Sequence, residues 1–310
     1  MKKIFIDGKA GTTGLRIFER LSSRDDVSVI VLPEEQRKDK DIRKKALNEA
    51  DIVFLCLPDE AAIEAVSLIE NPNTVVLDTS TAHRTNPGWA YGFPELSEEF
   101  EEKIRTSKRI AVPGCHASGF ISLVFPLIEA RIIPKDALLS CFSITGYSGG
   151  GKKMIADYES ENRSELLCAP RQYGIAQKHK HLPEMKKITG LENEPVFIPA
   201  VADYYSGMEV TVPVFASQLI NGAAADDIKN VYSKKYSGDI VKYVADFAED
   251  SFVSANKLSG KDGMEISVAG NEERILLISR YDNLGKGASG AALECMNTVL
   301  GLDKKTGLEL

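Results

Sequence analysis

The chain has 310 residues, of which 43% are hydrophobic and 27% are charged, a balance typical of folded globular proteins. This length predicts two domains. The formal net charge of −7 argues against a nucleic-acid-binding protein, since that class usually carries a basic stripe. The densest basic run, residues 37–45, is interrupted by Asp39 and Asp41, and we interpret it as a solvated helix face.

The cysteine spacing and the N-terminus together indicate the compartment. The five cysteines contain no C-x-x-C pair, so the sequence predicts neither a disulfide framework nor a zinc ribbon. The N-terminus lacks the apolar stretch of a signal peptide, and no apolar run of about 18 residues could span a membrane. We therefore expect a cytoplasmic protein in a reducing compartment, and no metal site.

The first 115 residues alternate between short apolar runs and helical patterns. The apolar runs predict strands at residues 3–6, 27–32, 51–57, 75–78 and 109–112. Helical spacing of apolar residues predicts helices at residues 12–21, 42–50 and 60–69. Near-continuous apolar strands separated by helices are typical of a parallel sheet that is buried on both faces. This segment is therefore predicted to form a doubly wound, Rossmann-type α/β domain.

The pattern changes after about residue 130. Longer strand-like runs cover residues 138–147, 196–201, 208–217, 240–247 and 274–281. They predict an α+β second domain with a mixed or antiparallel sheet. A final helix is predicted over residues 288–300.

Three glycines follow the first strand and open the first helix, at Gly8, Gly11 and Gly14. Glycines let the backbone turn tightly and approach a pyrophosphate, and the helix N-terminus offers free N–H groups. The hydroxyls of Thr12 and Thr13 can add donors. This turn predicts dinucleotide binding, although the same glycines could form a plain strand–helix turn.

The residues after the second strand give a mixed signal about the cofactor. An acidic residue there usually holds the ribose of NAD, and Glu34 or Glu35 could do so. Arg37 and Lys38 could instead meet the 2′-phosphate of NADP. We favour NADP.

Cys115 follows a strand and the turn Pro113–Gly114, at the point where a helix is predicted to begin. A helix N-terminus lowers the pKa of a thiol and offers N–H groups to an oxyanion. The sequence therefore predicts that Cys115 is a nucleophile. The alternative, a buried structural cysteine, suits Cys56, Cys141 and Cys295 better.

His179 and His181 are two of only four histidines in the chain. An enzyme that makes and breaks a thioester needs a group that exchanges protons near neutral pH, and histidine meets that need. Which of the two acts stays open, and Glu184 could orient one imidazole or bind substrate. A metal site lacks a third ligand at suitable spacing. The remaining alternative is a pair of exposed surface histidines.

Two polar loops are candidates for binding an anion. Residues 78–84 follow the fourth strand and bring Ser80 and Arg84 to the carboxyl edge of the sheet, where ligands of such folds bind. Arg84 could instead form a surface ion pair. Residues 147–153 contain Ser148 and a glycine run, which could cradle an anion or form a flexible hairpin loop.

Several short motifs together resemble the family of N-acetyl-γ-glutamyl-phosphate reductases, NADP-dependent enzymes of arginine biosynthesis, in its shorter second type. The motifs cover residues 8–14, 78–84, 91–96, 113–115, 179–184 and 282–290. The resemblance implies a fold like that of glyceraldehyde-3-phosphate dehydrogenase. A dinucleotide-binding domain would comprise residues 1–115 and 288–310, and a catalytic and oligomerisation domain residues 116–287.

The same resemblance implies roles for particular residues. Cys115 would be the nucleophile, and His179 and His181 would supply the acid/base group. Substrate contacts would come from Arg84, Ser148 and Glu184. Cofactor contacts would come from Gly8, Gly11, Thr12, Thr13, Gly14, Ser80, Asn283 and Lys286. The resemblance also implies a homo-oligomer, either a dimer or a tetramer.

The resulting hypothesis is reduction by NADPH of an acyl phosphate, N-acetyl-γ-glutamyl phosphate, through a thioester on Cys115. An enzyme like aspartate-semialdehyde dehydrogenase, acting on another acyl phosphate, is the first alternative. A non-catalytic protein that senses dinucleotides is an alternative from another class. A sensor would not need both a cysteine at a helix start and a histidine pair.

Overall fold

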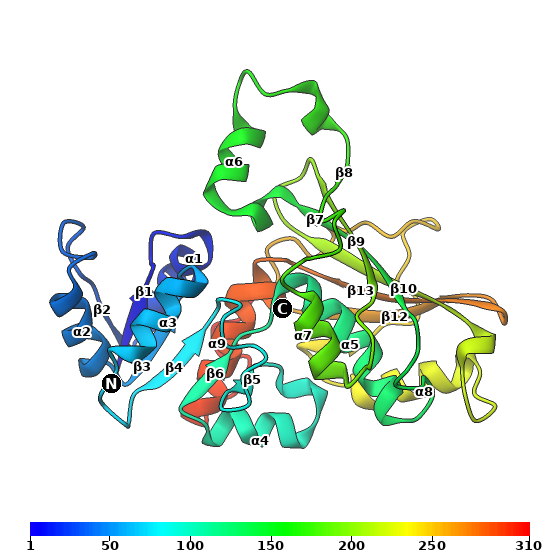
Figure 1. Ribbon diagram of the computed structural model, residues 1–310, viewed down its shortest axis with the longest axis horizontal. Helices are drawn as coiled ribbons and strands as arrows, with labels where there is room; N and C mark the ends of the chain where they lie inside the picture. Colours follow the sequence, from blue (N-terminus) through cyan, green and yellow to red (C-terminus); the bar gives the residue numbers. More distant parts are fainter. The chain divides into compact units, whose positions relative to one another are not determined.

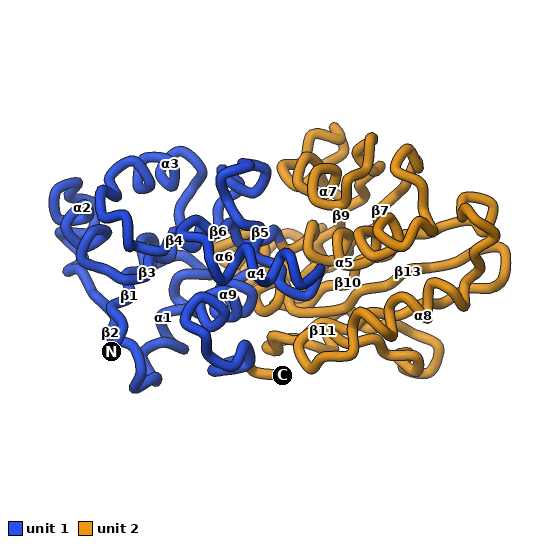
Figure 2. The backbone as a smooth tube through the Cα atoms, turned by 90° about the horizontal axis from the view of Figure 1, so that it is seen from below, with its two compact units in different colours: residues 1–114, 288–308 blue, residues 115–287, 309–310 orange.

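The computed structural model describes all residues from 1 to 310, and the chain forms two compact units (Figure 2). The first unit contains Met1–Gly114 and Ala288–Leu308, and the second contains Cys115–Gly287 and Glu309–Leu310. No helix of either unit combines the length and the apolar character needed to cross a membrane.

The first unit is built on a six-stranded parallel sheet with the order β2-β1-β3-β4-β6-β5 (Figure 1). The strands are β1 (Lys2–Asp7), β2 (Val27–Ile30), β3 (Ile52–Leu55), β4 (Val75–Asp78), β5 (Ala90–Tyr91) and β6 (Arg109–Ala111). The helices are α1 (Thr12–Ser22), α2 (Lys40–Glu49), α3 (Asp59–Ser67), α4 (Glu98–Thr106) and α9 (Gly290–Leu300), with a short 3-10 turn η1 (Pro94–Leu96).

Both faces of this sheet are covered, as the apolar strands predict. Side chains alternate across a strand, so Ile4 and Ile6 of β1 join one core while Phe5 joins another. The first core also takes residues of α1, α4 and α9, and the second takes residues of α2 and α3. The C-terminal helix α9 is therefore part of the first unit although it is far from it in sequence.

The second unit is built on a seven-stranded mixed sheet with the order β11-β12-β13-β10-β7-β9-β8. Neighbours are antiparallel except for the pairs β7–β9 and β11–β12. The strands are β7 (Ser140–Gly146), β8 (Arg171–Gln172), β9 (Val196–Ala202), β10 (Met208–Phe215), β11 (Val241–Tyr243), β12 (Met264–Gly270) and β13 (Arg274–Tyr281).

Helix α5 (Cys115–Glu129) lies against strands β10 and β13 of this sheet. Close approach depends on Gly119, since a Cβ there would lie 2.6 Å from both the Tyr281 hydroxyl and a Val210 methyl. The other helices are α6 (Gly151–Glu159), α7 (Leu182–Thr189) and α8 (Ala225–Lys235), with short turns η2 (Tyr147–Gly150), η3 (Glu165–Cys168), η4 (Ala216–Gln218) and η5 (Gly285–Ser289).

The predicted fold class is confirmed, a doubly wound parallel sheet and a mixed sheet. Three strands were not predicted, namely β5, β8 and β12. The first two have only two residues each, too few for a periodic pattern. The strand expected over residues 240–247 is shorter, since β11 ends at Tyr243.

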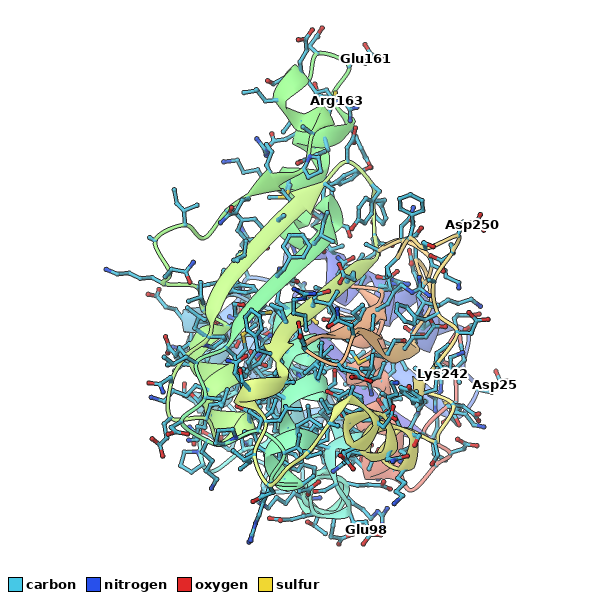
Figure 3. All side chains as sticks on the ribbon, turned by 90° about the vertical axis from the view of Figure 1, so that its right-hand side faces the viewer. Asp25, Glu98, Glu161, Arg163, Lys242 and Asp250 are labelled. Atoms are coloured by element: carbon cyan, nitrogen blue, oxygen red, sulfur yellow. The ribbon has the colours of Figure 1, made fainter.

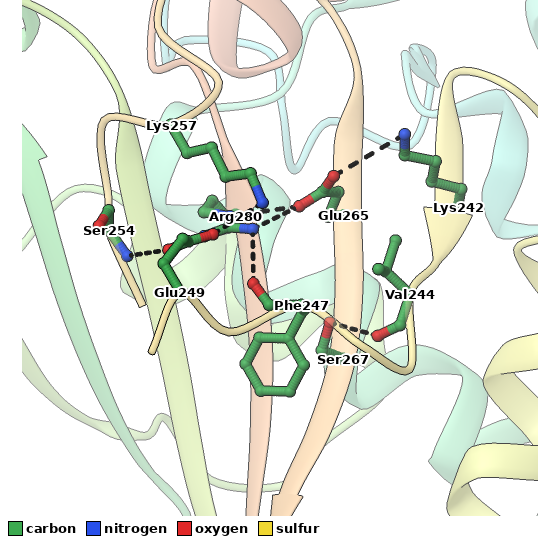
Figure 4. A network of polar contacts seen from close by, with 9 residues as sticks. All are labelled: Lys242, Val244, Phe247, Glu249, Ser254, Lys257, Glu265, Ser267 and Arg280. Carbon is green, nitrogen blue, oxygen red and sulfur yellow. Dashed lines mark hydrogen bonds and ion pairs between the residues drawn. The ribbon is translucent and has the colours of Figure 1, made fainter. Parts of the chain in front are cut away.

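An ion-pair network explains where the chain goes after β11 (Figure 4). Arg280 of β13 is buried and pairs with Glu265 at 2.7 Å and with Glu249 at 2.8 Å. Arg280 also donates to the Phe247 carbonyl at 3.0 Å, and Lys257 pairs with Glu249 at 2.7 Å. The chain therefore leaves the sheet edge after Tyr243, and this course places the Glu249 carboxylate against the buried Arg280 guanidinium.

Helix α6 belongs to a segment that extends away from the sheet, with Glu161 and Arg163 near its far end (Figure 3). Arg163 holds this segment by pairing with Asp203, just after β9, at 2.7 Å. The flexible hairpin loop considered for residues 147–153 is wrong, because Tyr147–Gly150 form the turn η2 and Gly151 begins α6. Gly151 has a φ of +70°, which few other residues adopt readily.

Candidate active site

A cavity of about 790 Å³ lies in the first unit beside the glycine turn. Its walls come from the end of β1, the turn after it, the end of β2 with the residues that follow it, and the residues after β3. The lining includes Asp7, Gly8, Lys9, Gly11, Glu34, Arg37, Lys38, Arg43 and Cys56. This volume lies in the range of ~300–1,000 Å³ that small-molecule and cofactor sites occupy.

The three glycines keep the turn open to a ligand. Gly8 has a φ of +87°, and a Cβ there would lie 2.2 Å from the Cys56 carbonyl oxygen. A Cβ on Gly14 would lie 2.6 Å from the Gly8 carbonyl oxygen. Gly11 is the N-cap of α1, whose first turn begins with Thr12 and Thr13 and carries no acidic side chain. The amino end of α1 is thus suited to an anion.

Charged groups of both signs stand beside this turn. Arg37 pairs with Glu34 at 2.7 Å, and both side chains are exposed. Arg43 of α2 is largely buried and pairs with Asp7 at 2.8 Å. Burial raises the pKa of Asp7, and Arg43 opposes that shift. Arg37 and Lys38 therefore remain the cations nearest to bulk solvent at this cavity.

The loop after β4 is ordered by buried polar contacts. Asp78 accepts hydrogen bonds from the Ser80 hydroxyl at 2.7 Å and lies 2.6 Å from His83 Nδ1. The His83 ring stacks on Trp89 with centroids 4.0 Å apart. Arg84 is buried and donates to the carbonyls of Thr79 and Val112 at 2.8 and 2.9 Å. Two hydrogen bonds of the Arg84 guanidinium thus go to backbone carbonyls of the first unit, to which Arg84 itself belongs.

Cys115 is half-buried and is the first residue of α5. The Tyr281 hydroxyl donates to the Cys115 carbonyl at 2.5 Å and accepts from the Gly119 amide at 3.0 Å. It therefore fixes the first turn of α5. Gly287 packs directly on the cysteine, since a Cβ there would lie 3.0 Å from the Cys115 Cβ. The sulfur thus sits on a rigid helix start, where the helix dipole favours negative charge.

Three histidines gather next to this helix start. The ring centroid of His116 lies 5.8 Å from that of His179 and 5.6 Å from that of His181, and the latter two rings are 4.8 Å apart. His179 and His181 do not share a strand. His179 lies in an irregular segment, and His181 is the N-cap of α7. The exposed-surface alternative is wrong for His181, which is buried.

Burial keeps two of these imidazoles neutral. Desolvation, with smaller effects of the charges of His179 and Lys180, lowers the pKa of His116 to about 3. Desolvation, with a smaller effect of Lys180, lowers the pKa of His179 to about 4. Near neutral pH both rings therefore carry one proton and offer one nitrogen as an acceptor.

Ser148, Asn283, Lys286 and Glu184 are all buried in the second unit. Asn283 donates to the Ser148 hydroxyl at 3.0 Å and accepts from the Gly207 amide at 2.9 Å. Glu184 lies in the first turn of α7, three residues after His181. The structure therefore joins Ser148 and Asn283, which the sequence could not pair.

Sequence reasoning missed His116 and Tyr173. His116 Nδ1 lies 2.6 Å from the Ser143 hydroxyl, and His116 Nε2 lies 2.6 Å from the Tyr173 hydroxyl. The position of His116 directly after Cys115 was an available signal. Nothing in the sequence singles out Tyr173, because it follows the short strand β8 and reaches the cluster only through the pairing of β9 with β7.

The parallel unit with a glycine turn, joined to a mixed-sheet unit, defines the class of two-domain NAD(P)-binding oxidoreductases. Residues 26–104 match the family described as semialdehyde dehydrogenase, NAD binding domain. Residues 115–283 match the family described as semialdehyde dehydrogenase, dimerisation domain. The N-acetyl-γ-glutamyl-phosphate reductase of Brucella ovis is 46% identical over 306 residues, which cover 96% of this chain and 99% of the relative. This chain belongs to the N-acetyl-γ-glutamyl-phosphate reductase family of the semialdehyde dehydrogenases.

Solved structures of more distant proteins share the fold. Aspartate semialdehyde dehydrogenase II of Vibrio cholerae matches with a TM-score of 0.72 at 17% identity, covering 97% of this chain and 98% of that one. The aspartate semialdehyde dehydrogenase of Candida albicans, solved with NADP, matches with a TM-score of 0.64 at 15% identity, covering 99% and 100%. At these identities the likeness concerns the fold alone.

The buried histidines predict a pH-dependent stability. The folded chain leaves His116 neutral down to about pH 3, while an unfolded histidine takes up a proton near pH ~6.5. Between these values only the unfolded chain binds the proton, so stability is lost as the pH falls below ~6.5. One such group contributes a slope of about 1.4 kcal/mol per pH unit.

His116→Gln should therefore flatten the pH dependence of unfolding by about that slope. The measurement is the free energy of urea unfolding at pH 7 and pH 4.5 for both proteins. The wild type should lose more stability between these pH values than the variant does. Equal losses would contradict a neutral, buried His116.

Proposed function

We propose that this chain reduces N-acetyl-γ-glutamyl phosphate with NADPH to N-acetyl-glutamate semialdehyde and phosphate, in arginine biosynthesis. The observation that carries the proposal is Cys115 at the start of α5, with three imidazoles beside that helix. The name of the Brucella relative gives the substrate, and 46% identity over 96% of the chain supports the transfer.

Cys115 begins the reaction as a nucleophile. Its thiolate attacks the carbonyl carbon of the acyl phosphate, a C–S bond forms, and the C–O bond to phosphate breaks. N–H groups in the first turn of α5 would hold the carbonyl oxygen as it gains negative charge. The Tyr281 hydroxyl keeps that turn rigid by bridging the Cys115 carbonyl and the Gly119 amide.

The reduced nicotinamide, when bound, supplies the hydride that converts the thioester into a thiohemiacetal. His179 or His181 relays a proton from water to the carbonyl oxygen as the hydride arrives, and takes that proton back as the C–S bond breaks, which releases the aldehyde and restores the thiolate. The lowered pKa of His179 supports this role, because a neutral ring can accept a proton. The lysines at 178 and 180 add positive charge for an anionic substrate.

The substrate contacts we propose are Arg84, Ser148 and Glu184. Arg84 offers a forked donor to a phosphate or carboxylate, and its bonds to Thr79 and Val112 would hold it in one orientation. The bond from Asn283 would similarly fix the Ser148 hydroxyl. Glu184 would orient an imidazole or bind the substrate from the first turn of α7.

The cofactor contacts we propose are Gly8, Gly11, Thr12, Thr13, Gly14, Ser80, Asn283 and Lys286. The cavity beside Gly8 has the size and the helix amino end that a dinucleotide needs. NADP is favoured over NAD because Arg37 and Lys38 can bind a 2′-phosphate. The Glu34 carboxylate, which could otherwise hold the ribose of NAD, forms an ion pair with Arg37.

Arg37→Ala should lower kcat/KM for NADPH about 10-fold and leave kcat/KM for NADH nearly unchanged, since one charge-assisted contact to phosphate is lost. Glu34→Gln should raise kcat/KM for NADPH, because it releases Arg37 from its ion pair. The check is steady-state kinetics with both cofactors. Equal decreases of kcat/KM with NADPH and NADH would show that Arg37 does not bind the 2′-phosphate.

The function itself is tested by a steady-state assay in the reverse direction. N-acetyl-glutamate semialdehyde, phosphate and NADP should give rapid phosphate-dependent formation of NADPH. Aspartate semialdehyde should be a poor substrate, and its preference over the acetylated compound would favour the first alternative. Binding of dinucleotide without turnover of either aldehyde would favour a sensor.

We also propose a cytoplasmic homo-oligomer, a dimer or a tetramer. The match of residues 115–283 to a family described as a dimerisation domain supports self-association. The five cysteines are all free thiols, which suits a reducing compartment. Light scattering after size exclusion would give the number of subunits.

A further inference from the structure

One fully buried carboxylate, that of Asp282, organises the turn after β13. Its Oδ1 accepts hydrogen bonds from the amides of Leu284 and Gly285 at 2.6 and 3.2 Å. Its Oδ2 accepts from the Ser206 hydroxyl at 2.9 Å and from the Gly260 amide. Such a set of donors suits a carboxylate, whose two oxygens offer several lone pairs as acceptors. Asp282 therefore ties its own turn to two other segments of the second unit.

Asn283, the next residue, has its side-chain amide held in one orientation. Its Oδ1 accepts from the Gly207 amide at 2.9 Å, and a backbone N–H can only donate. The amide nitrogen Nδ2 must therefore face the other way, where it donates to the Ser148 hydroxyl oxygen at 3.0 Å. Asp282 and Asn283 thus hold neighbouring residues, because the Asp282 carboxylate binds Ser206 and the Asn283 amide binds Gly207.

The Ser148 hydroxyl is left with a proton that has no acceptor in the chain. Asn283 Nδ2 donates to the oxygen, and the hydroxyl makes no other hydrogen bond. Asn283 Nδ2 cannot take the Ser148 proton, because an amide nitrogen only donates. Ser148 is 1% exposed, and a buried donor without an acceptor destabilises the fold. An acceptor that comes from a ligand would satisfy this donor.

A glycine keeps space open beside this pair of side chains. Gly149 follows Ser148 and is exposed, and a Cβ there would lie 3.5 Å from Asn283 Nδ2. This is an ordinary van der Waals distance, so a methyl group would fit without strain and would fill the space. Lys152 and Lys153 lie in the first turn of α6, which carries no acidic residue. The surroundings of the Ser148 hydroxyl therefore suit an anionic oxygen.

We propose that Asp282 and Asn283 together set the Ser148 hydroxyl as a donor to an anionic oxygen of the substrate. Asp282 is a positioning residue, because it fixes the turn that holds the Asn283 amide, and this amide leaves the Ser148 proton to a ligand. The ligand oxygen belongs to the phosphate group or to the carboxylate of the substrate, and both groups accept hydrogen bonds. This inference rests on the proposed function, whose substrate carries both anions.

The test is steady-state kinetics in the reverse direction, with N-acetyl-glutamate semialdehyde, phosphate and NADP. Ser148→Ala should raise one KM about 10-fold and change kcat by less than about twofold. A higher KM for phosphate would identify a phosphate oxygen as the ligand, and a higher KM for the aldehyde would identify the carboxylate. Asp282→Asn, which places a donor where the carboxylate accepts, should raise the same KM about 10-fold.

The double variant shows whether Asp282 acts through Ser148. If it does, Asp282→Asn combined with Ser148→Ala should raise that KM about 10-fold, whereas independent residues would give about 100-fold. A purely structural effect of Asp282 would lower stability and would multiply with the effect of Ser148→Ala. Ser206→Ala removes a single donor from the Asp282 carboxylate, so it is a milder variant if Asp282→Asn does not fold. It should raise the same KM about threefold, with the same coupling to Ser148→Ala.

Glu265→Gln is the matched control. Glu265 is also a buried carboxylate of the second unit, and its partner Arg280 lies two residues before Asp282 on the chain. Glu265→Gln should lower stability and leave both KM values within about twofold of the wild type. Gly149→Ala should raise the same KM as Ser148→Ala does, because its methyl group fills the space for the anion, without lowering the midpoint of urea unfolding.

A second readout needs no turnover. Inorganic phosphate or N-acetyl-glutamate, whichever carries the bound anion, should raise the midpoint of thermal unfolding of the wild type, because it binds only the folded chain. The rise should be lost in Ser148→Ala and Asp282→Asn and kept in Glu265→Gln. Failure of the aldehyde assay with this pattern of midpoints would reject only the proposed substrate. Unchanged KM values and midpoint shifts in folded Asp282→Asn and Ser206→Ala, or effects that multiply with that of Ser148→Ala, would overturn the positioning role.

Discussion

Cys115→Ser should lower the rate of phosphate-dependent turnover by about 10⁴-fold or more, the scale seen when a covalent nucleophile is removed. A serine hydroxyl stays protonated at neutral pH, and the helix dipole that favours a thiolate cannot ionise it. The glycine turn and its cavity belong to the first unit and do not involve Cys115. NADPH binding, followed by nucleotide fluorescence, should therefore stay within about twofold of the wild type.

The control is Cys168→Ser, which removes an exposed thiol at the end of η3. It should keep full activity. Burial raises the pKa of Cys56 to about 12 and also raises the pKa of Cys141, so neither thiol can replace Cys115. Normal turnover by Cys115→Ser would show that the reaction does not pass through this sulfur.

Gly8→Ala should weaken NADPH binding about 100-fold and lower the free energy of unfolding by about 2–4 kcal/mol. The backbone of Gly8 has a φ of +87°, a region that alanine enters only with strain. The added Cβ would also lie 2.2 Å from the Cys56 carbonyl oxygen, which belongs to rigid backbone next to β3. The glycine turn must therefore shift away from the amino end of α1. Isothermal titration with NADPH and urea unfolding measure the two effects.

Gly11→Ala provides a graded comparison in the same turn. Gly11 has an ordinary φ of −72°, and its added Cβ would lie 3.4 Å from the Gly8 carbonyl oxygen and 3.8 Å from that of Cys56. Gly11→Ala should weaken NADPH binding only about 10-fold, against about 100-fold for Gly8→Ala. It should lower the free energy of unfolding by less than about 1 kcal/mol. Equal losses in the two variants would mean that the strain at Gly8 does not shape the cofactor site.

Much of the site could be predicted because its parts are local. Gly8, Gly11 and Gly14 are spaced within one strand–turn–helix unit, so their role follows from backbone geometry alone. Cys115 stands directly after a Pro–Gly turn, which marks the helix start whose dipole acts on the thiol. His179 and His181 were found as a pair because they are two residues apart. An irregular segment and the N-cap of α7 bring the two rings beside His116 of α5.

The sequence by itself determined the parallel sheet, the glycine turn, the helix that begins at Cys115 and the histidine pair, because each depends on residues close together in the chain. Only the tertiary structure decided that His116 is held between Ser143 and Tyr173, and that Asn283 holds Ser148. These contacts join residues that are 27 to 135 positions apart. Strand order and helix packing fix such contacts, and no local pattern of residues encodes them.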